Sequence, residues 1–79
     1  MMFYYMNKKT DIQAIIFNKL KYTLGETQKY IKEHSYKPIK EVHITGMYYR
    51  YRLKNPNLFY RFITKQIKPG IYLILGFYK

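Results

Sequence analysis

Cysteine is absent from this sequence of 79 residues, so neither disulfide bonds nor thiolate metal sites can stabilise the fold. A reducing compartment is compatible with that composition. A domain of this length lies near the size at which one hydrophobic core is only just sufficient. Eleven tyrosines and five phenylalanines offer one compensation, because they bring large apolar area with few rotatable bonds. Assembly into a homo-oligomer is the other route to stability.

Acidic residues are also scarce. Four Asp and Glu stand against fifteen Lys and Arg, which gives a formal net charge of +11. All four acids lie in the first 41 residues, and the stretch from 42 to 79 contains only basic charges: Arg50, Arg52, Lys54, Arg61, Lys65, Lys68 and Lys79. A field of one sign on a small domain favours polyanions, nucleic acid first and an anionic membrane second. The alternative is a codon bias toward lysine in an A/T-rich genome.

Long apolar runs are missing too. No stretch approaches the roughly twenty apolar residues that a membrane-spanning helix needs. The run from Met1 to Met6 is too short for the core of a signal peptide, and it precedes its charges instead of following them. We therefore expect a soluble, intracellular protein without a membrane partner, whose translation starts at Met1 or Met6.

Groups that could carry catalysis are few and scattered. Neither His34 nor His43 lies near a second ligand type at the spacing of a metal site. The four acids are too dispersed to suggest a general acid/base pair or an Mg²⁺ site. Gly70-Ile71-Tyr72 matches the first half of the GIY-YIG nuclease signature, but its second half would fall beyond Lys79. We expect no enzyme activity and no cofactor.

The stretch from Tyr22 to Pro38 predicts the helix around which the chain is organised. Thr23 and Glu26 have the spacing of a capping box at its start. At 100° per residue, one side of this helix collects Leu24, Thr27, Tyr30, Ile31 and His34. We expect about three helical turns that pack on one face of a sheet, with His34 as a structural histidine on the buried side.

The rest of the chain has strand patterns. Residues 11–18 are apolar on both faces, which predicts a central strand with Ile12, Ala14 and Ile16 on one face and Ile15 and Phe17 on the other. Residues 39–45 and 47–54 alternate and meet at a glycine, which predicts a hairpin. Residues 58–67 fit a strand or a short helix. Residues 71–78, after a Pro-Gly turn, fit another central strand.

These elements predict an α+β fold, in which one helix packs on a small, mainly antiparallel sheet of four to five strands. The order along the chain is strand, helix, hairpin, strand. We assign residues 11–79 to this single domain. Residues 1–10 form an N-terminal aromatic and polar segment, either a short strand or a tail that docks through Phe3, Tyr4 and Tyr5.

The clearest functional signal is Tyr48-Tyr49-Arg50-Tyr51-Arg52. On a strand, Tyr48, Arg50 and Arg52 project from one side, so an aromatic ring stands beside two guanidinium groups. Such a surface can stack unpaired bases and hold phosphates. We predict a nucleic-acid-binding face formed by Tyr48, Arg50, Arg52, Lys54, Arg61, Lys65 and Lys68. The alternative is a plain hairpin with Tyr49 and Tyr51 in the core and merely solvated arginines.

Four stretches of the sequence also resemble a known domain. They are Ile-Gln-Ala-Ile-Ile-Phe (12–17), Tyr-Thr-Leu-x-Glu-Thr-x-Lys-Tyr-Ile-Lys-Glu-His-Ser-Tyr-Lys-Pro-Ile-Lys (22–40), Tyr-Tyr-Arg-Tyr-Arg-Leu (48–53) and Thr-Lys-Gln-Ile-Lys-x-Gly-Ile-x-Leu-Ile-Leu-Gly-Phe (64–77). Over residues 11–78 the chain resembles a small, uncharacterised basic domain found in tailed phages and large eukaryotic DNA viruses. Gly25 departs from it, because relatives prefer a better helix former there. The prefix 1–6 lies outside it.

The resemblance implies viral origin and no catalytic residues. We therefore expect a viral accessory protein that binds nucleic acid through the Tyr/Arg face, in the infected host cell and with little sequence preference. The alternative is a minor virion component, or an inhibitor of an acidic host protein whose surface complements the positive charge.

Overall fold

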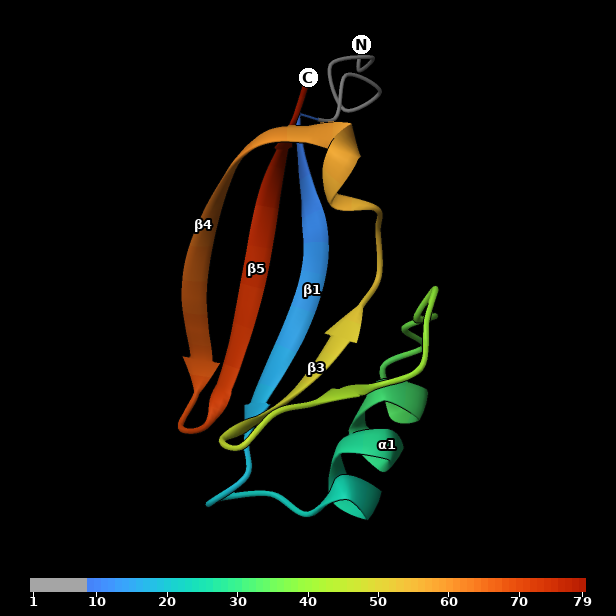
Figure 1. Cartoon of the computed structure of the whole chain (residues 1–79), viewed down its shortest axis with the longest axis vertical. Helices are drawn as coiled ribbons and strands as arrows, with labels where there is room; N and C mark the ends of the chain where they lie inside the picture. The colour runs from blue at the N-terminus through green and yellow to red at the C-terminus, as the bar shows by residue number, and fades with distance from the viewer. Residues whose placement is uncertain (1–8) are drawn as a thin grey trace, which may run out of the picture.

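The computed structural model describes residues 9–79, so the proposed docking of Phe3, Tyr4 and Tyr5 lies outside the described residues. Within 9–79 the chain forms one α-helix and one five-stranded sheet (Figure 1). The elements are β1 (Thr10–Asn18), α1 (Leu24–Glu33), β2 (His43–Ile44), β3 (Tyr48–Arg52), the 3-10 turn η2 (Pro56–Leu58), β4 (Phe59–Lys68) and β5 (Ile71–Tyr78). The sheet order is β2-β3-β1-β5-β4, with every neighbouring pair antiparallel. The predicted α+β fold class is confirmed.

The start of α1 is set by the capping box that the sequence predicts. Thr23 Oγ1 accepts a hydrogen bond from the backbone N–H of Glu26 at 3.2 Å, and Glu26 Oε1 accepts from the backbone N–H of Thr23 at 2.8 Å. Two backbone donors that the first helical turn leaves free are thereby satisfied. The helix ends at Glu33, and Ser35 just beyond it has a left-handed φ of 58°.

His34 does not take the buried place that the helical periodicity assigns to it. The residue is exposed because the helix has already ended, and it acts as the C-cap. Its ring stacks on Tyr30 with centroids 3.9 Å apart, and its Nδ1 lies 2.9 Å from the Tyr30 carbonyl oxygen. Burial raises the pKa of the Tyr30 phenol, and the nearby phenols of Tyr36 and Tyr22 add to that rise.

One face of the sheet, which we call the helix face, packs against α1. Its core consists of Ile15, Phe17, Ile31, Tyr51 and Ile71, each at most 6% exposed. The Phe17 ring meets Tyr51 edge-on with centroids 5.8 Å apart. The Tyr51 hydroxyl lies 2.7 Å from Thr27 Oγ1, which itself donates to the Leu24 carbonyl oxygen at 2.7 Å. The buried hydroxyls between helix and sheet are therefore satisfied.

β1 is central, as predicted, but its two faces do not follow simple alternation. Ile12 pairs with Leu75 and Ala14 pairs with Ile74, so Gln13 is an extra residue in β1 and forms a β-bulge. Because adjacent residues of β5 point to opposite faces, Ile12 and Ala14 do so too. The prediction that Ile12 shares a face with Ala14 is wrong, and Ile12 packs against the core of the helix face.

The bulge is held from the side of β3. The Gln13 carbonyl oxygen accepts hydrogen bonds from the backbone N–H groups of Leu53 and Lys54 at 2.8 and 3.2 Å. The Gln13 side-chain amide donates to the Lys54 carbonyl oxygen at 2.9 Å. These bonds explain how a polar side chain is only 2% exposed inside a small domain.

The hairpin after the helix is confirmed, but its first strand is shorter than predicted. Only His43 and Ile44 of the expected strand 39–45 form β2, opposite Arg50 and Tyr49. The preceding residues 39–42 are irregular, because the chain there passes from the helix layer to the edge of the sheet (Figure 1). The ambiguous stretch 58–67 is strand, since Phe59–Lys68 pairs along β5.

Glycine is required at two points of the β4–β5 pair. Gly70 follows Pro69 in the turn and has a φ of 84°, which side-chain-bearing residues rarely adopt. Gly76 lies in β5 beneath the Phe59 ring, which occupies the space that a Cβ would need. The ring thereby fills the gap that the missing side chain leaves.

The capping box gives a first prediction. Thr23→Ala should lower the free energy of unfolding by about 1 kcal/mol, because it removes the acceptor for the Glu26 N–H. Gly25→Ala should raise it by up to about 1 kcal/mol, since nothing lies within 4 Å of the added Cβ. Thermal melts followed by circular dichroism measure both shifts. Shifts in the opposite directions would contradict the role given to the cap.

Candidate nucleic-acid interface

The sheet face opposite α1, which we call the open face, carries the predicted Tyr/Arg side chains. Cross-strand partners share a face. Arg50 pairs with Ile16 and Arg52 with Ala14, whereas Tyr51 pairs with the core residue Ile15. Within residues 9–79, no α-helix and no second sheet covers the open face. The predicted alternation of β3 is therefore confirmed.

Exposure along β3 agrees with this register. The Tyr48 side chain is 40% exposed, and the Tyr51 side chain is 5% exposed. Arg50 and Arg52 are half-buried on the open face. The structure thus brings Tyr48, Arg50 and Arg52 together, as the sequence predicts.

The open face is concave. Two adjoining hollows of about 350 and 310 Å³ lie on it and share Thr64 and Ile74. Residues of β3 and of β4 line both hollows, although two strands separate β3 from β4 in the sheet. We call the combined depression the trough. Its lining comprises Tyr48, Arg50 and Arg52 on the β3 side with Pro56 just beyond them, Phe62 and Thr64 on the β4 side, and Gln13, Ile16, Tyr72 and Ile74 between them.

Concavity buries the middle of the open face, over which residues 9–79 place no second layer. Ala14 is 0% exposed and Ile74 is 9% exposed, because the side chains on both walls shield them from water. Arg50 contributes to this cover, and its Nε is buried without a hydrogen-bond partner within residues 9–79. A buried, unpaired donor costs about 1–3 kcal/mol, which an oxygen acceptor bound beside Arg50 would relieve.

A smaller hollow adjoins the arginines at the β2 edge. It measures about 210 Å³ and is lined by Lys40, Glu41, His43, Arg50 and Arg52. Four of these five side chains are basic residue types, and Glu41 is the one acid among them. The predicted hairpin already placed residues 39–45 beside β3, but Lys40 and His43 were missed as members of the site because the pattern does not show which residues of the two strands face each other.

Three of the predicted residues lie on the helix face instead. Arg61 pairs with Phe77, Lys65 with Leu73 and Lys68 with Ile71, all on the side of β5 opposite Ile74. The Arg61 guanidinium carbon lies 4.7 Å from the centroid of the Phe77 ring. The structure therefore does not bring Arg61, Lys65 and Lys68 together with Arg50 and Arg52.

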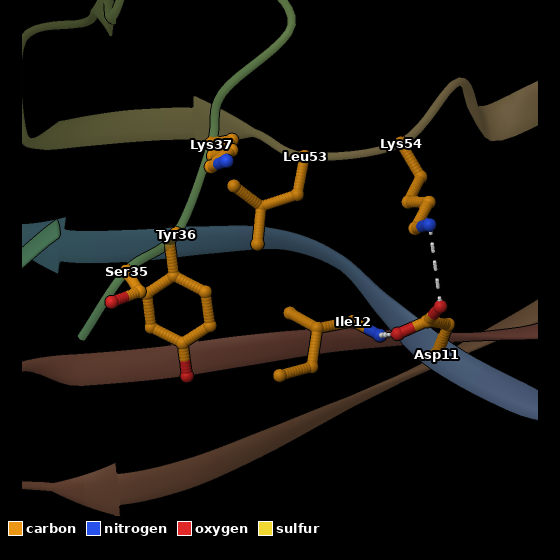
Figure 2. A pocket seen from close by; sticks show the side chains of 7 residues that line it. All are labelled: Asp11, Ile12, Ser35, Tyr36, Lys37, Leu53 and Lys54. Atoms are coloured by element: carbon orange, nitrogen blue, oxygen red, sulfur yellow. Dashed lines mark hydrogen bonds and ion pairs between the residues drawn. The ribbon is translucent and has the colours of Figure 1, made fainter. Parts of the chain in front are cut away.

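Lys54 lies at the end of β3 in a different setting. Its Nζ is 3.5 Å from Asp11 Oδ2, and that carboxylate also accepts a hydrogen bond from the Tyr78 hydroxyl at 3.0 Å. Figure 2 shows this ion pair at one end of a cleft of about 360 Å³, lined by Asp11, Ile12, Ser35, Tyr36, Lys37, Leu53 and Lys54. Because Asp11 offsets part of its charge, Lys54 adds less to the positive potential than either arginine.

Among residues 9–79, no three His, Asp or Glu side chains are grouped so that they could hold a metal ion. No helix in the same range is long and apolar enough to cross a membrane.

Burial in β3 gives a second prediction. Tyr51→Ala should cost about 3 kcal/mol or more, because it leaves a cavity in the core and removes one of the two hydrogen bonds of the Thr27 hydroxyl. Tyr48→Ala removes an exposed side chain and should cost less than about 1 kcal/mol. Urea unfolding of the two variants measures the difference. A larger loss for Tyr48→Ala would mean that the two faces of β3 have been exchanged.

Comparison with known proteins adds no relative: no protein-family model matches the chain, and no curated protein or solved structure matches it significantly. The resemblance to the phage and viral domain stays a prediction.

Proposed function

We propose that this protein binds single-stranded nucleic acid along the trough, without catalysis and with little sequence preference. One observation carries the proposal. Arg50 and Arg52 stand next to each other on one wall of a concave face whose lining also holds the rings of Tyr48, Phe62 and Tyr72. The proposal includes an accessory role in a virus-infected cell, and that part rests on the sequence resemblance alone.

Ring and guanidinium groups suit the two parts of a nucleotide. Arginine holds phosphate oxygens through paired N–H groups, and aromatic rings stack on bases. Each hollow of the trough is near the lower end of the volumes found for small-molecule sites, which suits single bases. A duplex keeps its base faces stacked inside, so only an unpaired strand can use the apolar floor.

Charge supports the same ligand class. The net charge of +11 attracts polyanions at long range, and Lys40, Arg50 and Arg52 line the trough or the smaller hollow beside it. Apart from the arginines, the polar groups of the lining are the hydroxyls of Tyr48, Thr64 and Tyr72 and the Gln13 amide, which already donates to the Lys54 carbonyl oxygen. Apolar stacking with few polar contacts favours binding that tolerates many sequences.

The proposal predicts a steep salt dependence. If those three cations contact phosphates, the affinity for a single strand should fall about twentyfold between 50 and 200 mM salt. Fluorescence anisotropy with a labelled oligothymidylate and a labelled oligouridylate measures it. Absence of binding at 50 mM salt, or an affinity that does not change with salt, would overturn the proposed function.

A matched pair of double variants tests whether the trough is the contact. Arg50→Ala with Arg52→Ala should weaken binding at least about tenfold, because each arginine makes a charge-assisted contact worth about 1.5–3 kcal/mol. Lys29→Ala with Lys32→Ala removes the same charge from exposed positions of α1 and should weaken binding less than about threefold. Melting curves of both variants show that the fold is retained. Equal losses in the two pairs would show general charge attraction instead of binding in the trough.

A further inference from the structure

Within residues 9–79, β4 is a long edge strand of the sheet with no strand paired to its outer side. It pairs with β5 on one side only, whereas the opposite edge, β2, has just two residues. All residues of β4 after Phe59 are exposed. Several of them are large and apolar: Tyr60 is 66% exposed, Phe62 42%, Ile63 40% and Ile67 38%. Free backbone groups beside exposed apolar side chains make such an edge a template for another strand.

We propose that this edge pairs with β4 of a second copy of the chain, antiparallel and about a two-fold axis. A two-fold axis perpendicular to the sheet keeps the faces of the two copies aligned, so a helix-face residue must meet a helix-face residue. Arg61, Ile63 and Lys65 belong to the helix face, and Phe62, Thr64 and Gln66 belong to the open face. These faces restrict the registers that two copies can adopt.

Three registers place the two-fold axis near the middle of β4, at Ile63, Thr64 or Lys65. The positions of the cations favour one of them. An axis at Ile63 would set Arg61 opposite Lys65 of the second copy, and an axis at Lys65 would set the two lysines against each other. Like charges directly opposite are destabilising. An axis at Thr64 instead places Lys65 opposite Ile63 and Phe62 opposite Gln66, in both directions. The geometry therefore favours pairing centred on Thr64.

This pairing has a salt dependence opposite to that of nucleic-acid binding. Two copies of charge +11 repel each other, and salt screens that repulsion. Bulges between Phe59 and Arg61 and between Gln66 and Lys68 also confine regular pairing to the middle of β4. The dimer should be weak at low salt and tighten as salt rises. Its test contains no nucleic acid, so its outcome does not depend on the proposed function.

The absence of cysteine allows a direct test of the register. Thr64→Cys should form a disulfide-linked dimer under mild oxidation at least ten times faster than Gln28→Cys, a control at an exposed position of α1. Ile63→Cys alone should stay close to the control, because its diagonal neighbour lies about 7–8 Å away. A mixture of Ile63→Cys and Lys65→Cys should cross-link rapidly. Equal rates for Thr64→Cys and Gln28→Cys would overturn the proposal.

Sedimentation equilibrium gives an independent measurement on the unmodified chain. The dimer dissociation constant should fall at least threefold between 50 and 500 mM salt. Ile63→Lys should raise that constant at least tenfold, because it sets a further cation opposite Lys65 while leaving the core intact. A wild-type chain that stays monomeric at both salt concentrations, or an Ile63→Lys variant that dimerises like wild type, would refute the pairing through β4.

Discussion

One short helix can cover only part of a five-stranded sheet, and the rest of the molecule follows from that limit. α1 shields the helix face over β1 and β3, where the Tyr51 and Thr27 hydroxyls lock the two layers together. No other element of the described chain covers the open face, so curvature buries its centre: both walls of the trough shield Ala14 and Ile74. Neither α1 nor the curvature of the sheet shields β4, so its side chains after Phe59 are exposed to water.

Features with local causes could be predicted from the sequence. The capping box needs only Thr23 and Glu26, and the alternation of β3 follows from a tight turn at Gly46 that fixes its register. The bulge could not be predicted, because the spacing of Ile12 and Ala14 is what an unbroken strand would show. Gln13 becomes an extra residue only through its bonds to Leu53 and Lys54 on the neighbouring strand.

The same distinction between local and long-range causes separates the site residues that could be predicted from those that could not. Tyr48, Arg50 and Arg52 lie within one strand, so their shared face could be predicted from alternation alone. The faces of Arg61 and Lys65 depend on how β4 meets β5, including a bulge near Phe59 that no sequence pattern marks. The trough itself arises because twist accumulates across several strands. Its floor is therefore made of residues that look like ordinary strand positions.

The bulge in β1 also affects which deletions this strand can accept during evolution. Gln13 resets the phase of β1, so Asp11 stands on the side where Tyr78 and Lys54 reach its carboxylate. If Gln13 were lost, Ile12 and Ala14 would follow one another and could keep Leu75 and Ile74 as their partners, so Asp11 would stay on the same side. Loss of a residue between Ala14 and Asn18 would instead move the side chains beyond it to the opposite face. β1 should therefore tolerate the loss of one residue at the bulge far better than the loss of one farther along the strand.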